Sequence, residues 1–144
     1  MQKPLLSASE QEQIVEAIRA AEMATSGEVR VHIEQFCPET DVLERTKEVF
    51  EQLGMHRTDL KNGVLFYLAV TDRKFAVIGD RGINERVPDG FWNDVRDLMR
   101  ACFVKQAYSD GLSKGIELAG QQLKTYFPRQ NDDVNELPDD ISFG

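Results

Sequence analysis

The sequence predicts an α/β fold, an α/β/α sandwich whose small mixed β-sheet (a βαββ core) is flanked by about four helices. Residues 28–34 alternate between apolar and polar side chains, which is the period of a strand. Residues 63–70 are continuously apolar, which is typical of a strand covered on both faces. Between them, residues 40–53 place apolar side chains along one helical face and end before Gly54, which indicates a crossover helix between two parallel strands.

The remaining elements follow from turn signals and helical spacing. Residues 7–10 form a capping-box pattern, so a first helix is expected over residues 8–25. Residues 71–73 leave room only for a hairpin, so residues 74–79 should return antiparallel beside the second strand. Two later segments have apolar stripes at helical spacing and should cover the sheet: Phe91, Trp92, Val95, Leu98, Met99, Cys102 and Phe103, then Leu112, Ile116, Ala119, Leu123 and Phe127.

The first strand is expected to have one buried face and one polar face. Val29, Val31 and Ile33 fall on the first, and His32 and Glu34 lie on the second with Arg30. A lone histidine on such a face is more often solvated or hydrogen-bonded than catalytic. We therefore assign His32 no catalytic role.

The chain's length and charge limit its organisation and partners. Its 144 residues suit one domain, expected over residues 1–128, followed by an acidic, flexible tail over residues 129–144. The formal charge is −8, and no basic stripe carries interleaved aromatic residues, which argues against nucleic-acid binding. A divalent cation or a basic protein partner fits this charge better.

The sequence shows no segment that suggests export or membrane insertion. No window approaches the ~18 apolar residues of a membrane span, and no apolar signal region is visible near the N-terminus. Cys37 and Cys102 lack the spacing of a metal site and are expected to be free thiols. We expect a monomer in the cytoplasm that does not bind membranes.

Acidic side chains are expected to gather at one edge of the sheet. In a right-handed βαβ unit followed by a hairpin, the starts of the first two strands and the end of the third lie at the same edge. Carboxylates at one place repel one another unless a cation lies between them, and oxygen ligands favour Ca²⁺, Mg²⁺ or Mn²⁺. The predicted metal ligands are Glu28, Asp59, Asp80, Glu85, Asp89 and Asp110.

Two considerations oppose a metal site there. The acids also suit helix caps, turns and solvated surface, with Asp89 as a cap and residues 80–82 as a turn. Open α/β sheets more often bind ligands at the carboxyl ends of their parallel strands, here near residues 35–40 and 71–72. Both interpretations remain open from the residues alone.

Searches for catalytic motifs identify no nucleophile or base. The calcium-loop, phosphate-loop and dinucleotide-binding patterns are absent. A cysteine phosphatase would need an arginine six residues after its nucleophile, but Leu43 follows Cys37 and Tyr108 follows Cys102 at that distance. The catalytic residues are therefore unknown, and an enzymatic activity is left open.

The order and spacing of several segments resemble a known family. Residues 26–31 (SGEVRV), 61–68 (KNGVLFYL), 71–74 (TDRK), 78–84 (IGDRGIN) and 108–112 (YSDGL) together resemble the TPM domain, also called the TPM phosphatase family, over about residues 7–127. The resemblance implies an α/β/α sandwich and, for some members, calcium binding or acid phosphatase activity. By position, Glu28, Asn62-Gly63 and Asp89 match the family's pattern. The family's G-Y-G-L-E-G loop is replaced by residues 79–85, so its acid is displaced or missing.

Three functions remain as hypotheses. The first is a calcium-binding, regulatory or binding module that uses the acids named above. The second is a metal-dependent acid phosphatase, in which the cation polarises a phosphoryl oxygen and Arg73 or Arg81 holds the phosphate. The third is an adaptor that acts through the acidic tail, whose apolar side chains are Val134, Leu137, Ile141 and Phe143.

Overall fold

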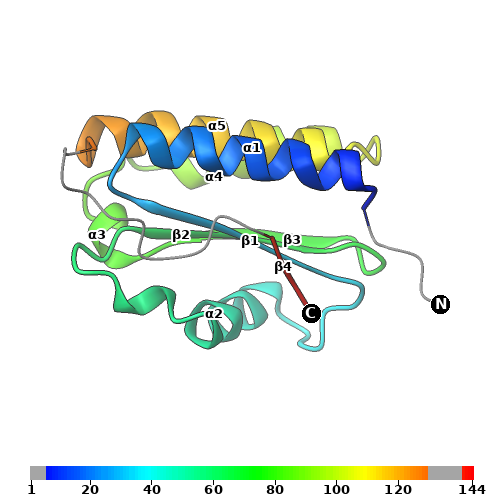
Figure 1. Ribbon diagram of the computed structural model, residues 1–144. Helices are drawn as coiled ribbons and strands as arrows, with labels where there is room; N and C mark the ends of the chain where they lie inside the picture. The colour runs from blue at the N-terminus through cyan, green and yellow to red at the C-terminus, as the bar shows by residue number, and fades with distance from the viewer. Residues whose placement is uncertain (1–5, 130–140) are drawn as a thin grey trace.

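The computed structural model describes residues 6–129 and 141–144 of the chain (Figure 1). Within these residues, four strands form one mixed sheet: β1 (Glu28–Glu34), β2 (Gly63–Ala69), β3 (Lys74–Gly79) and β4 (Ile141–Phe143). Their order across the sheet is β3-β2-β1-β4. Strand β1 pairs parallel with both β2 and β4, and β2 pairs antiparallel with β3. The predicted βαββ core is confirmed, and β4 is an addition to it.

The helices form a layer on each face of the sheet, as Figure 1 shows. Helices α1, α4 and α5 lie on one face, and α2 lies on the other. The helical elements are α1 (Ala8–Ala24), α2 (Val42–Gln52), the 3₁₀ turn η1 (Met55–Arg57), α3 (Arg81–Asn84), α4 (Phe91–Phe103) and α5 (Tyr108–Tyr126). This arrangement confirms the α/β/α sandwich.

Two hydrophobic cores follow from the alternation of side chains along the strands. Val29 and Val64 belong to the larger core, which lies beneath α1, α4 and α5. Leu65 and Tyr67 belong to the smaller core, where Phe50 of α2 covers them. Because successive strand residues point to opposite faces, the continuous apolarity of β2 supplies both cores.

Strand β1 differs from its prediction. We expected a half-buried strand, but six of its seven residues are buried and only Arg30 is partly exposed. The face with His32 and Glu34 is covered because Arg45 from α2 and Ser142 from β4 contact these side chains. The alternating pattern indicated the strand correctly, but the polar face is not solvated.

The end of the predicted tail also differs from expectation. Residues 141–143 form β4 and pair with residues 31–33 of β1, so this part of the tail packs on the domain. Residues 130–140, with Val134 and Leu137, lie outside the described residues. None of the helices in residues 6–129 combines the length and apolarity needed to cross a membrane.

Candidate functional site

The starts of β1 and β2 and the end of β3 meet at one edge of the sheet, as chain direction predicts. The Glu28 amide donates to the Asn62 carbonyl oxygen over 3.2 Å, and the Asp80 amide donates to the Gly63 carbonyl oxygen over 2.9 Å. Glu28 lies opposite Gly63 in the parallel register, and Gly79 lies opposite Val64 in the antiparallel register. We call this edge, defined by Glu28, Gly63 and Asp80, the amino edge.

Glu28 and Gly63 share the face of the sheet that α2 covers. Their neighbours Val29 and Val64 belong to the larger core on the opposite face. Gly79 also lies on that opposite face, because a Cβ there would come within 2.6 Å of the Trp92 ring in α4. Asp80 follows Gly79 and therefore starts on the α2 face. Across the sheet, Glu28 therefore lies on one side of Gly63 and Asp80 on the other.

Glu28, Gly63 and Asp80 form a row across the strands, and a main-chain oxygen lies close to Gly63 in this row. A Cβ on Gly63 would lie 3.3 Å from the carbonyl oxygen of Met55, which belongs to η1. The side chain of Glu28 is buried, and that of Asp80 is partly buried. The row therefore combines two carboxylates with a nearby carbonyl, all of which are oxygen ligands of the type that Ca²⁺ accepts.

Several buried polar atoms at the amino edge have no hydrogen-bond partner among the described residues. These are Thr58 Oγ1, Asn62 Nδ2 and Asp80 Oδ2. Thr58 and Asn62 are both 2% exposed. Because an unsatisfied buried polar atom costs about 1–3 kcal/mol, such atoms at one edge suit a ligand. The amide of Asn62 can present its oxygen instead of its nitrogen after a flip.

The other predicted ligands lie away from this row. Asp59 is exposed in the loop before β2, and Glu85 and Asp89 are exposed after α3. Gly90, not Asp89, is the N-cap residue of α4, so the predicted capping role of Asp89 is wrong. The predicted turn at residues 80–82 is the start of the short helix α3, and the Asp80 side chain accepts from the Arg81 amide.

Asp110 lies at the opposite end of the molecule from the amino edge. Its Oδ1 accepts a hydrogen bond from Gln13 Nε2 over 2.9 Å, near the starts of α1 and α5. The other end of α5 reaches the amino edge, where the Ser26 amide donates to the Phe127 carbonyl oxygen over 2.9 Å. A helix of 19 residues is about 28 Å long, so Asp110 does not join the other acids.

The described part of the chain contains no group of three or more His, Cys, Asp and Glu side chains placed to hold a metal ion. Within the described residues, Glu28 and Asp80 are therefore the carboxylates available to a cation at the amino edge. Neutral oxygens would have to complete its coordination, and the amino edge offers these in Met55, Thr58 and Asn62.

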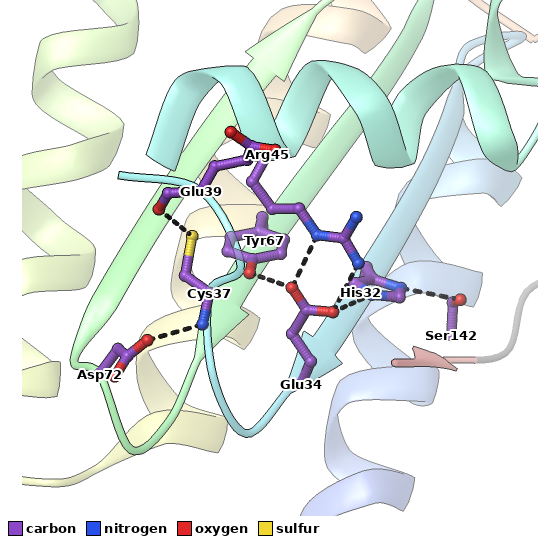
Figure 2. A network of polar contacts seen from close by, with 8 residues as sticks. All are labelled: His32, Glu34, Cys37, Glu39, Arg45, Tyr67, Asp72 and Ser142. Atoms are coloured by element: carbon purple, nitrogen blue, oxygen red, sulfur yellow. Dashed lines mark hydrogen bonds and ion pairs between the residues drawn. The ribbon is translucent and has the colours of Figure 1, made fainter. Parts of the chain in front are cut away.

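The structure places a second polar cluster at the opposite edge of the sheet, which the sequence did not reveal (Figure 2). Glu34, the last residue of β1, accepts a two-pronged contact from Arg45 of α2, with Nε to Oε2 at 2.9 Å and Nη2 to Oε1 at 2.8 Å. The Tyr67 hydroxyl donates to Glu34 Oε2, and His32 Nε2 lies 3.3 Å from Glu34 Oε1. His32 Nδ1 contacts Ser142 Oγ of β4 at 2.9 Å. We call these residues the Glu34 cluster.

The charges of the Glu34 cluster are fixed by their mutual contacts. Burial raises the pKa of Glu34, but hydrogen bonds from Arg45, Tyr67 and His32 outweigh it and lower the pKa to about 2. Burial and the hydrogen bond to Glu34 raise the pKa of Tyr67, so its hydroxyl stays a donor. The Glu34 cluster at neutral pH is thus a carboxylate held by a guanidinium and a neutral phenol.

This arrangement is better suited to hold elements together than to react. Each carboxylate oxygen of Glu34 already has two contacts, so its accepting positions are filled. Arg45 belongs to α2, Tyr67 to β2 and Ser142 to β4. The Glu34 cluster therefore joins α2 and β4 to the centre of the sheet.

The pKa of His32 is lower than the ordinary histidine value, so its ring is expected to stay neutral to a lower pH. Burial lowers its pKa below 6.5; the Glu34 contact opposes this, and the charges of Arg45 and Arg30 reinforce it. The unfolded chain then binds more protons than the folded chain below pH 6.5, so His32 makes stability fall as the pH falls through this range. An NMR pH titration of the His32 ring checks this. A His32 midpoint at or above the ordinary histidine value of 6.5 would contradict the expectation.

The loop after β1 closes onto the β2–β3 turn beside the Glu34 cluster. The Cys37 amide donates to Asp72 Oδ2 over 2.7 Å (Figure 2). Cys37 and Cys102 are both free, as predicted. Asp72, at the carboxyl end of β2, is thus engaged by the chain itself.

Comparisons with known proteins agree with this architecture. The family model of the TPM domain matches residues 2–122. Among solved structures, the BA42 protein of the psychrophilic bacterium Bizionia argentinensis is 46% identical, with a TM-score of 0.91 over 100% of this chain and 99% of that one. The N-terminal domain of a P. gingivalis protein is 23% identical, with a TM-score of 0.69 over 88% of this chain and 83% of that one.

A third structure extends the similarity of the fold. The N-terminal domain of the cg2496 protein of Corynebacterium glutamicum is 13% identical, with a TM-score of 0.67 over 89% of this chain and 78% of that one. The comparison with curated proteins gives no match. The match to the family model covers most of the chain, and the sandwich described above agrees with it. The chain belongs to the TPM domain family.

Proposed function

We propose that this TPM domain binds a divalent cation, Ca²⁺ in particular, at the amino edge, with Glu28 and Asp80 as its carboxylate ligands. The observation that supports this is their position on either side of Gly63 on one face of the sheet. Asp80 Oδ2 and Thr58 Oγ1 are buried oxygens that lack a partner among the described residues. Ca²⁺ accepts carboxylate, hydroxyl and carbonyl oxygens together, which suits this set.

The proposed site should bind weakly. Few charged ligands give low calcium affinity, so we expect a Kd of about 10⁻⁴–10⁻³ M. Arg30 is the next residue after Glu28 on the same face of β1, and its positive charge further limits the attraction. Mg²⁺ demands a stricter octahedral arrangement and gives up its water reluctantly, so it should bind less well than Ca²⁺. Asp59 and Glu85, exposed in the neighbouring loops, would add only screened, longer-range attraction.

A calcium titration followed by amide NMR tests the proposal. Saturable shifts are expected at residues 28, 55–63 and 79–82, and Glu28→Gln or Asp80→Asn should weaken binding at least tenfold. Asparagine is also a good N-cap residue, so Asp80→Asn should leave α3 in place. Asp110→Asn is the matched control, because it removes one negative charge at the far end of α5.

Each outcome of this titration has a definite meaning. Equal loss of affinity in Asp80→Asn and Asp110→Asn would show general electrostatic attraction and contradict the site. Diffuse shifts without saturation up to about 10 mM Ca²⁺ would contradict binding in the expected range. If Glu28→Gln fails to fold, Asp80→Asn alone decides the question.

The phosphatase hypothesis has less support from the geometry. Of its two candidate phosphate-binding arginines, Arg81 lies at the amino edge, but Arg73 lies in the β2–β3 turn at the opposite edge. Of these two arginines, only Arg81 would thus lie near a cation at the amino edge. We therefore put cation binding first.

A further inference from the structure

A pocket of about 360 Å³ opens at the end of the molecule opposite the amino edge. Its apolar lining includes Leu68 of β2, Phe75 of β3 and Phe103 of α4. Phe75 and Phe103 meet edge to face, with ring centroids 4.9 Å apart. The volume falls in the range of about 300–1,000 Å³ that is usual for small-molecule sites, which are also mostly apolar.

The charged side chains that line this pocket are both arginines, Arg73 and Arg100. The chain as a whole carries a formal charge of −8. The lining of this pocket is locally positive, because its residues include two arginines and no acid. The Arg100 guanidinium lies over the Phe75 ring, 5.7 Å from its centroid. Its ion pair to Asp97 is long at 3.9 Å and exposed, so it contributes little.

Arg73 brings a positive charge to the lining of this pocket. No hydrogen bond or ion pair of its side chain occurs within the described residues. The nearest acid in sequence, Asp72, accepts from the Cys37 amide instead. Asp110, close to the pocket residue Tyr108 in sequence, accepts from Gln13. Asp72 and Asp110 thus both contact groups other than the pocket arginines.

The backbone at the rim takes up conformations that cost energy. Arg73 has a φ of 55° and Gln106 a φ of 60°, and both residues line the pocket. Side chains other than glycine rarely adopt this left-handed region, and such strain persists mainly where the surrounding structure imposes it, as at ligand sites. Together the two turns bring Arg73 and Gln106 to one apolar cavity.

We propose that this pocket binds a small organic anion with a flat apolar body, its carboxylate or phosphate held by Arg73 and Arg100. The apolar body would lie over Phe75 and Phe103, where it removes apolar surface from water. A guanidinium group can bind two oxygens of a carboxylate or phosphate at once, so two arginines in the lining of this pocket suit an anionic ligand. The pocket is separate from the amino edge, so its ligand is independent of a bound cation.

Titration with 3-phenylpropionate, followed by amide and side-chain NMR, tests this site. For a ligand of this size we expect a Kd of about 1 mM, with shifts at residues 68, 73–75 and 100–108. The uncharged 3-phenylpropionamide should bind about tenfold more weakly, since it cannot pair with a guanidinium. Phenyl phosphate and inorganic phosphate distinguish the charged group from the apolar body: the first should bind, and the second should bind far more weakly.

Charge variants at the mouth separate this site from general attraction. Arg73→Gln and Arg100→Gln should each weaken 3-phenylpropionate about tenfold, whereas Arg19→Gln, on the exposed surface of α1, should not. Val104 lines the pocket and is 74% exposed, so it can be changed without loss of core packing. Val104→Lys should tighten binding, and Val104→Glu should weaken it.

Two results would overturn the proposal. One is equal affinity for the acid and the amide, which would mean that the arginines do not recognise the anion. The other is shifts that lie outside the pocket or persist unchanged in the Arg73→Gln, Arg100→Gln double variant. Because both arginines are exposed, these variants should fold, and a normal amide spectrum before titration verifies that.

Discussion

An Arg45→Met variant is expected to lose about 3 kcal/mol of unfolding free energy at pH 7. Methionine keeps much of the apolar stem but removes the two contacts to Glu34. The Glu34 side chain is only 6% exposed, so its carboxylate would remain buried without its main positive partner. Breaking a buried pair by removing one member costs far more than the pair contributes, because the remaining charge is poorly solvated.

The loss should depend on pH. In the native protein the pKa of Glu34 is lowered to about 2 from its usual 4.5, so this group stabilises the fold above pH 4.5 and ceases to as the pH falls towards 2. Without Arg45 the pKa of Glu34 rises, since burial raises it and only the hydrogen bonds from Tyr67 and His32 then oppose this. Urea unfolding at pH 7 and pH 3 should therefore show a smaller difference between wild type and variant at pH 3.

Two further variants show whether the charge of Arg45 or its packing is responsible. Arg19→Met removes an exposed arginine whose contact to Glu16 is 3.5 Å, and should change stability by less than about 0.5 kcal/mol. Adding Glu34→Gln to Arg45→Met should recover part of the loss, because the buried charge is then gone. A loss equal at pH 3 and pH 7 would assign the effect to packing.

A Gly82→Ala variant is expected to lose about 3 kcal/mol and to disturb the amino edge. A Cβ on Gly82 would lie 2.2 Å from the Leu60 carbonyl oxygen and 2.5 Å from that of Lys61. Both atoms are backbone, so no side chain can rotate away. The Gly82 amide also donates to the Lys61 oxygen over 2.9 Å, which joins α3 to the loop before β2. The added methyl group would separate these two segments.

Thermal or urea unfolding measures this loss, and Gly90→Ala is the matched control. Gly90 has a φ of 82°, but a Cβ there would meet nothing within 4 Å, so alanine should cost only about 1 kcal/mol of backbone strain. If the two variants lose equal stability, the close approach at Gly82 is not what demands glycine there. The position of Asp80 should also change in Gly82→Ala, which would weaken any calcium binding at the amino edge.

The sheet could be predicted from the sequence because its signals are local. The alternation of residues 28–34 and the apolar run from Gly63 identified two strands, and the short turn before Lys74 identified the third. Chain direction alone then placed Glu28 and Asp80 at a common edge. These inferences need no knowledge of how distant segments pack.

The rest of the site depends on packing between distant segments. The alternation placed His32 and Glu34 on one face, but nothing local indicates that α2 brings Arg45 onto that face or that Tyr67 faces the same way. Asp110 lies apart from the other acids because α5 begins at the end of the molecule opposite the amino edge, where Asp110 contacts Gln13. Strand β4 is only three residues long, and its partners in β1 lie 110 positions earlier in the chain, so no periodicity could identify it.

The short strand β4 has a consequence for how the protein behaves at high concentration. Without β4, β1 would be an edge strand, and the backbone N–H and C=O groups of residues such as Val31 and Ile33 would be unpaired. Long apolar edge strands pair with strands of neighbouring chains and thereby start aggregation. With β4 in place, the outermost strand on this side has three residues, which is too short to serve as a good template. The contact between Ser142 and His32 thus also helps to keep separate copies of the chain apart.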